Sequence, residues 1–142
     1  MLYFDTSFLA PLILEEPTSA RIERFMARLP AGELAVSHWT RVEFSSLLAR
    51  EVRVGGLKPQ AAKEADAEFE AIVAESFVVL LPDADDFSLA KEYLGHHRTG
   101  LRGGDALHLA IAGNRRVETI YSLDKTLLKA GKTLGLAVSV GI

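Results

Sequence analysis

Four acidic residues stand where a carboxylate is costly unless another group binds it. A carboxylate beside buried chain must be paired, hydrogen-bonded or bound to a metal ion. Carboxylate oxygens are also the ligands that hard divalent cations prefer. The four candidates, each in or beside an apolar segment, are Asp5, Glu43, Asp105 and Asp124.

Asp5 and Glu43 each have a competing structural explanation. Asp5 ends an apolar strand-like run and could cap the helix that follows, but Thr6 or Ser7 could cap it at less desolvation cost. We therefore favour a metal ligand at Asp5. Glu43, taken alone, would be a surface residue of a helix. Leu47 lies one helical turn later on the same face, which indicates that Glu43 points inward and needs a charged partner.

Asp105 is the one acid of a very apolar predicted helix and lies in its first turn, where the helix dipole favours an ionised carboxylate. Simple capping is the alternative, but it does not explain a charge placed after Gly103-Gly104, which allow close approach to other backbone. Asp124 follows a strand and, taken alone, is best explained as a helix cap. Ser122 can add a hydroxyl to the same cluster. His108 is expected to be a core residue or to support the ligands.

Short apolar runs alternate with helical patterns along the chain, which is typical of an α/β domain. Strands are predicted at 2–5, 34–37, 77–81, 119–122 and 137–140. Helices are predicted at about 7–14, 18–29, 39–52, 59–73, 83–94, 105–112 and 124–130. This order implies a mostly parallel sheet covered on both faces. In such sheets the site lies beyond the carboxyl ends of the strands, which selects Asp5 and the segment 122–124.

Composition sets outer limits on function. The 142 residues fit one compact domain, and the 49% hydrophobic content is enough for a core. Without cysteine there is no disulfide or thiolate metal site. The net charge of -3 excludes a basic protein that coats nucleic acid, so any RNA must bind at a local site. No segment has the roughly 20 apolar residues of a membrane span, and the expected location is the cytoplasm.

The remaining charged residues have simpler explanations. Asp83, Asp85 and Asp86 cluster at a predicted helix start, where they cap its free amides. Three basic residues flank the acids in sequence and could hold RNA phosphates, with solubility as an equal alternative. They are Arg98, Arg102 and Lys125.

Four segments resemble those of one protein family. YFDTSFLA, TRVEFSSLLAR, LRGGDALHLA and YSLDKTLLKAGKTLGLAV occur in the order seen in PIN domains, from Leu2 to about Val140. No single segment is specific, but four together in a chain of this length are far more so. In particular the chain resembles the VapC-type toxins of toxin–antitoxin pairs. The resemblance implies that residues 1–142 form a single three-layer α/β/α PIN domain with about five mostly parallel strands.

The resemblance also implies a set of functional residues. The four acids of the family fall on Asp5, Glu43, Asp105 and Asp124, and the last of these is the most variable in the family. The hydroxyl residue that often accompanies the first acid falls on Ser7, or on Thr6. Where the family commonly has threonine before the last acid, this chain keeps the hydroxyl as Ser122. These hydroxyls are expected to orient the metal ligands or water.

The activity implied is an endoribonuclease that hydrolyses RNA with one or two Mg²⁺ or Mn²⁺ ions held by the acids. The implied partners are a small antitoxin and a second copy of the chain in a homodimer. The target RNA stays open.

A non-enzymatic PIN-fold binding module is the alternative. A haloacid dehalogenase-type phosphatase is disfavoured because Ser7 stands where its second aspartate would be, and no phosphate-binding loop of the P-loop type is present.

Overall fold

Five parallel strands form one sheet in the computed structural model, which describes all residues from Met1 to Ile142. In chain order they are β1 Leu2–Phe4, β2 Leu34–Ser37, β3 Val78–Leu80, β4 Thr119–Tyr121 and β5 Val138–Ser139. Across the sheet the order is β3-β2-β1-β4-β5, and every neighbouring pair is parallel. The predicted fold class is therefore confirmed.

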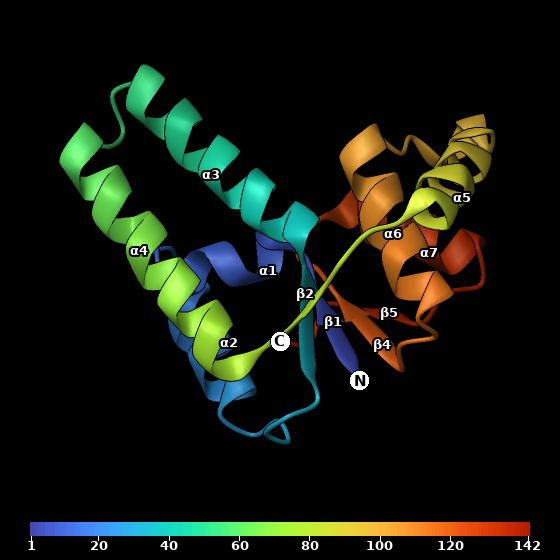
Figure 1. Ribbon diagram of the computed structural model, residues 1–142, viewed down its shortest axis with the longest axis horizontal. Coiled ribbons are helices and arrows are strands. Elements are labelled where there is room, and N and C mark those ends of the chain that lie inside the picture. Colours follow the sequence, from blue (N-terminus) through green and yellow to red (C-terminus); the bar gives the residue numbers. More distant parts are fainter.

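Helices connect the strands and cover both faces of the sheet (Figure 1). They are α1 Thr6–Leu9, α2 Ser19–Met26, α3 His38–Arg53, α4 Pro59–Ser76, α5 Ala84–Leu94, α6 Gly103–Asn114 and α7 Lys125–Thr133, with short 3-10 segments η1 Ala10–Leu12 and η2 His97–Thr99. None of the helices combines the length and the hydrophobicity that crossing a lipid bilayer requires.

Alternation along the central strand divides the core into two layers. Leu2 and Phe4 face the layer that contains α1 to α4, whereas Tyr3 faces the layer that contains α5 to α7. In the first layer the rings of Phe44 and Phe69 stack with centroids 4.1 Å apart and hold α3 against α4. Because Phe44 is fully buried, the rotation of α3 about its axis is set, and this determines where its neighbour Glu43 points.

The strand order creates a switch point beside β1. From β1 the chain moves through β2 and β3 on one side, and it later returns through β4 and β5 on the other. The loops that follow β1 and β4 therefore leave the sheet at the same edge and lie side by side. The amide of Asp5 donates to the carbonyl of Tyr121 at 3.1 Å across this junction. Such a junction is where open parallel sheets commonly bind ligands.

Several predicted boundaries shift for identifiable reasons. The first helix is predicted to reach residue 14, but α1 ends at Leu9 and continues as the 3-10 segment that contains Pro11, which has no amide hydrogen to donate. The helix predicted at 18–29 ends at Met26, and Thr18 makes no side-chain cap. In the predicted helix 39–52, Val52 is half-buried rather than buried, whereas Leu48 is buried.

The largest correction concerns the start of α6. The sequence predicts that Gly103-Gly104 precede a helix beginning at Asp105, whereas α6 begins at Gly103 and both glycines form its first turn. Asp105 is therefore the third residue of the helix and not its cap. The capping explanation of Asp105 is thereby excluded, since α6 has no side-chain cap at all.

Candidate active site

The four acids belong to four different elements that meet at the carboxyl edge of the sheet. Asp5 caps α1, Glu43 lies in the second turn of α3, Asp105 in the first turn of α6, and Asp124 caps α7. Figure 1 shows α3 and α6 on opposite sides of the strand ends. A cavity of about 620 Å³ opens between them, here called the acidic cavity. It is lined by Trp39, Glu43, Gly100, Arg102, Gly104, Asp105, Asp124 and Thr126.

Asp5 lies buried behind this cavity, with 3% of its surface exposed. Its carboxylate accepts hydrogen bonds from the Ser7 hydroxyl at 2.8 and 3.0 Å, from the Ser122 hydroxyl at 2.6 Å and from the Phe8 amide at 3.0 Å. Burial raises the pKa of Asp5, and the hydrogen bonds and the nearby His108 only partly oppose this. Both predicted supporting serines thus contact the first acid directly.

The same two serines connect Asp5 to Asp124. The Ser122 hydroxyl accepts the Asp124 amide at 2.9 Å, and the Ser7 hydroxyl accepts the Leu123 amide at 2.9 Å. Asp124 uses its own carboxylate to cap α7, accepting the Leu127 amide at 2.8 Å. The capping function expected of Asp124 is therefore present, and the residue still lines the acidic cavity.

Glu43 has the charged partner that its position requires. Its Oε2 accepts a hydrogen bond from the Thr6 hydroxyl at 2.7 Å and forms a short bond with Nε2 of the buried His108. Burial acts to raise the pKa of Glu43, but the bonds and charge of His108 outweigh it, and the net pKa is lowered. Thr6 therefore supports Glu43, whereas Ser7 supports Asp5.

His108 belongs to a buried chain of hydrogen bonds that the sequence does not reveal. Its Nδ1 lies 2.7 Å from the Tyr3 hydroxyl, which donates to the Ser37 hydroxyl at 2.9 Å. Because the Tyr3 hydroxyl donates its one hydrogen to Ser37, its oxygen accepts from Nδ1 of His108. The Glu43 carboxylate accepts from Nε2, so both ring nitrogens of His108 carry hydrogen. Burial opposes the imidazolium, yet the interactions with Tyr3 and Glu43 prevail and raise the pKa of His108. His108 thus holds Glu43 as an ion pair.

Asp105 differs from the other acids because its surroundings do not satisfy it. Burial, together with the charges of Asp124, Glu43 and Asp5, raises its pKa to about 6, and the charge of His108 opposes this. The main influences on Asp105 are burial and like charges, and none is a hydrogen-bond donor. The carboxylate faces the cavity with a charge that a cation would neutralise.

Gly104 allows this crowding. A Cβ atom at this position would lie 2.7 Å from Oε1 of Glu43 and 3.3 Å from Cζ2 of Trp39, so any other residue here would require the Glu43 side chain to move. The indole Nε1 of Trp39 is buried without a hydrogen-bond partner, although its proximity helps to lower the pKa of Glu43. Trp39 is not among the site residues predicted from the sequence. The signal for it is a tryptophan one helical turn before an inward-facing glutamate.

The chemistry of these donors suits a hard cation, but their arrangement is not yet that of a coordination sphere. No group of three histidine or acidic side chains lies close enough together to hold one metal ion. Three of the four acids are instead occupied by hydrogen bonds within the protein, whereas Asp105 is not. Ion binding would therefore require some of the carboxylates to change rotamer.

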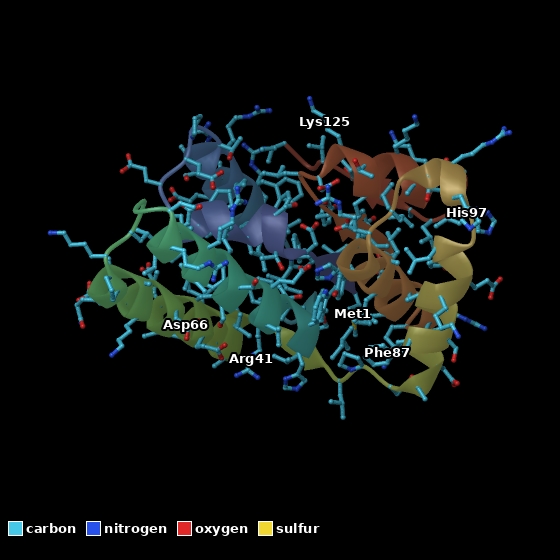
Figure 2. All side chains as sticks on the ribbon, turned by 90° about the horizontal axis from the view of Figure 1, so that it is seen from above. Met1, Arg41, Asp66, Phe87, His97 and Lys125 are labelled. Carbon is cyan, nitrogen blue, oxygen red and sulfur yellow. The ribbon has the colours of Figure 1, made fainter.

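The three basic residues predicted to contact RNA lie in different places. Arg102 lines the acidic cavity. Arg98 lines a separate cavity together with His97 and Lys129. Lys125 is exposed at the start of α7, and Figure 2 shows Lys125 and His97 at the outer surface of the molecule. Of these three residues, only Arg102 lines the acidic cavity.

Known proteins share this architecture. VapC20 of Mycobacterium tuberculosis, a toxin that cleaves the sarcin-ricin loop, is 24% identical with a TM-score of 0.75, over 92% of this chain and 95% of that one. VapBC-1 of nontypeable Haemophilus influenzae is 16% identical with a TM-score of 0.68, over 98% and 97%. PAE2754 of Pyrobaculum aerophilum is 26% identical with a TM-score of 0.65, over 98% and 83%.

Sequence comparison places the chain in one family. No curated protein is significantly similar to it. Residues 2–132, however, match the family described as the PIN domain, and this match spans nearly the whole sequence. The chain therefore belongs to the PIN-domain family.

Proposed function

We propose that this protein is a metal-dependent endoribonuclease of the VapC type, and that it is the toxin of a toxin–antitoxin pair. The observation that carries the proposal is the state of Asp105. Its pKa is raised to about 6 by burial and by three other acids from separate elements. Glu43 is paired with His108, but Asp105 has no hydrogen bond or ion pair of its own and faces an open cavity.

The proposed metal ligands are Asp5, Glu43, Asp105 and Asp124, for one or two Mg²⁺ or Mn²⁺ ions. A bound ion would supply Lewis acidity and activate a water for attack on phosphorus. Ser7 and Ser122 hold the Asp5 carboxylate in place. Asp5, Glu43 and Asp124 are thus pre-positioned by hydrogen bonds within the fold, whereas Asp105 has the freedom to adjust.

Three residues beside the proposed metal ligands have supporting roles. The ion pair with His108 keeps Glu43 charged and oriented, so that it can bind a cation or a water with its other oxygen. Arg102, on the wall of the acidic cavity, is placed to hold an RNA phosphate there. Trp39 presents a buried N–H beside Glu43 that an incoming oxygen ligand could accept.

The direct test is cleavage of structured RNA in magnesium by the parent protein and by Asp5→Asn. The parent should cut, and the variant should not, while circular dichroism shows that both are folded. Equal cleavage by both would remove Asp5 from the ligand set. The absence of any cleavage by the parent, with all RNAs and metals tested, would instead favour the binding module that lacks turnover.

Metal binding separates the enzyme from that alternative without an activity assay. Calorimetric titration of the protein with magnesium should give a binding isotherm that Asp105→Asn abolishes. Bound ion should also raise the unfolding temperature, because it binds only the folded protein. No binding at millimolar magnesium would leave the PIN-fold binding module as the better account.

The proposed partners are RNA, a small antitoxin and a second copy of the chain, acting in the cytoplasm. An acidic cavity on a protein of net charge -3 is a suitable dock for an arginine of the antitoxin. Co-expression with the protein encoded beside this one should relieve the growth arrest caused by the toxin. Sequencing RNA 5′ ends after induction would identify the target, and light scattering would show whether the chain is a dimer.

A further inference from the structure

A second cavity lies beside η2 and α7, and its walls have the opposite character. It has a volume of about 350 Å³, and it contains neither an apolar nor an acidic residue. We call it the basic cavity. Its walls are formed by His96, His97, Arg98, Thr99, Lys129 and Thr133. A cavity lined by cations and by no acid is unexpected in a protein with 19 acidic residues against 16 lysines and arginines.

The cations of this cavity have no partner within the protein. Arg98 and Lys129 are both exposed, and neither takes part in any of the ion pairs. Those ion pairs use Arg41, His108, Arg115 and the terminal amine instead. Two unpaired cations that share one cavity form a suitable environment for an anion with several oxygens.

The loop that carries Arg98 is held in a defined shape. The Thr99 hydroxyl donates to the carbonyl of His96 at 2.9 Å and accepts the amide of Leu101 at 3.3 Å. Gly100 then takes a left-handed conformation with φ of 71°, which other residues adopt only with strain. Because the loop is already ordered, less entropy is lost when the cavity binds a ligand.

The basic cavity adjoins the acidic cavity along two stretches of chain. Gly100 lines the acidic cavity, and its neighbour Thr99 lines the basic one. Thr126 lines the acidic cavity, and Lys129, three residues later on α7, lines the basic one. At 1.5 Å per helical residue the two positions are about 4.5 Å apart along the axis. The two cavities therefore lie next to each other along α7.

We propose that the basic cavity binds the phosphates of the RNA next to the bond that is cut in the acidic cavity. This inference rests on the proposed function, because it takes the acidic cavity as the place of cleavage. Arg98 and Lys129 neutralise the flanking phosphates and donate hydrogen bonds to their oxygens. No hydrophobic residue lines the cavity, and its position next to the acidic cavity favours RNA over an acidic segment of a protein.

The test measures RNA affinity without cleavage. A short single-stranded RNA of mixed sequence is titrated with the protein in chelator at several salt concentrations, and binding is followed by fluorescence anisotropy. The Arg98→Gln/Lys129→Gln double variant should bind more weakly. Its slope of log affinity against log salt should be shallower by about 1.4, since each phosphate contact on a single strand contributes about 0.7.

A charge-matched control isolates the cavity from general electrostatics. Arg50→Gln/Lys63→Gln removes the same charge from exposed positions on α3 and α4. This variant should keep the slope of the parent. Equal slopes for the two double variants would overturn the proposal. Displacement of the RNA by polyglutamate as readily as by inorganic polyphosphate would also overturn it, in favour of an acidic protein partner.

The two proposals fail in different ways. If the parent cleaves RNA in magnesium but the slopes of the double variants agree, the basic cavity is not an RNA subsite and the nuclease stands. If the slopes differ as expected but the parent never cleaves, the RNA subsite stands and the nuclease falls.

Discussion

Two clusters of buried or half-buried acids in this protein differ in whether the central carboxylate has a cationic partner. This difference separates a structural role from a functional one. At the start of α5, Asp86 is fully buried, and its carboxylate accepts bonds from Arg115 and from Asn114. At the carboxyl edge of the sheet, Asp105 is influenced mainly by burial and by the charges of other acids, with only the charge of His108 in the opposite sense. Both residues lie in the first turn of a helix.

The electrostatic outcome follows from the partners. Burial acts to raise the pKa of Asp86, but the bonds from Asn114, the Asp83 amide and Arg115 outweigh it and lower the pKa. At Asp105 burial is joined by like charges, and the pKa rises to about 6. A carboxylate that already has its cation is a structural element, whereas one that lacks it is a candidate for binding one.

The largest expected effect separates the two clusters by activity. Asp105→Asn should slow RNA cleavage by more than about 100-fold, since even groups that only support metal ligands contribute about 10–100-fold. The rate is measured on a structured RNA in saturating magnesium. Asp85→Asn, at the exposed start of α5, is the matched acid-to-amide control and should cut like the parent. Parent-like cleavage by Asp105→Asn would show that Asp105 has no role in activity that the α5 acids lack.

The reverse experiment changes stability and spares activity. Asp86→Ala should lower the free energy of unfolding by about 2–3 kcal/mol. It removes charged hydrogen bonds and leaves the side chains of Arg115 and Asn114 without this acceptor. Urea denaturation measures this loss, with Asp85→Ala as control. Cleavage per folded molecule should be unchanged. A large loss of specific activity would show that the α5 cluster also serves the site.

Removing the Tyr3 hydroxyl should weaken metal binding by about tenfold, because it releases the histidine that orients Glu43. Tyr3→Phe keeps the buried ring, so the fold should persist. Magnesium affinity is read by calorimetry, which does not depend on catalysis. Tyr93→Phe, a half-buried tyrosine of α5, is the control. Unchanged affinity in Tyr3→Phe would reduce the His108 chain to a packing feature.

The smallest effect is a difference in pH dependence. In chelator, the free energy of unfolding should fall as pH rises from about 4 to about 6, because folding raises the pKa of Asp105 from 3.8 to about 6 and so favours its protonated form. Asp86 acts in the opposite sense. Its lowered pKa stabilises the fold above pH 4, and this contribution is lost as the pH falls further.

Urea unfolding between pH 4 and 7 measures both contributions. Asp105→Asn should flatten the decline above pH 4, and saturating magnesium should reverse it, because the ion binds the carboxylate form. A decline of the same size in Asp105→Asn would assign the pH dependence to another group.

Local patterns were sufficient for much of the fold. All five strands and seven helices are close to their predicted places because apolar periodicity and capping residues act over a few residues. Asp83 and Asp124 cap their helices as predicted. The boundaries that moved lie where side-chain patterns are weakest, such as the glycine turn that opens α6. A glycine pair is equally compatible with a loop and with a first helical turn.

What the sequence determined by itself was the set of acids, since an acid inside apolar chain is unfavourable in any fold. Only the tertiary structure decided the partners of each acid. Two serines bind Asp5 and His108 binds Glu43, whereas Asp105 has no hydrogen bond and lies among like charges. These relations join residues up to 117 positions apart. Desolvation and pairing depend on which surfaces meet in space, and no local pattern along the chain contains that information.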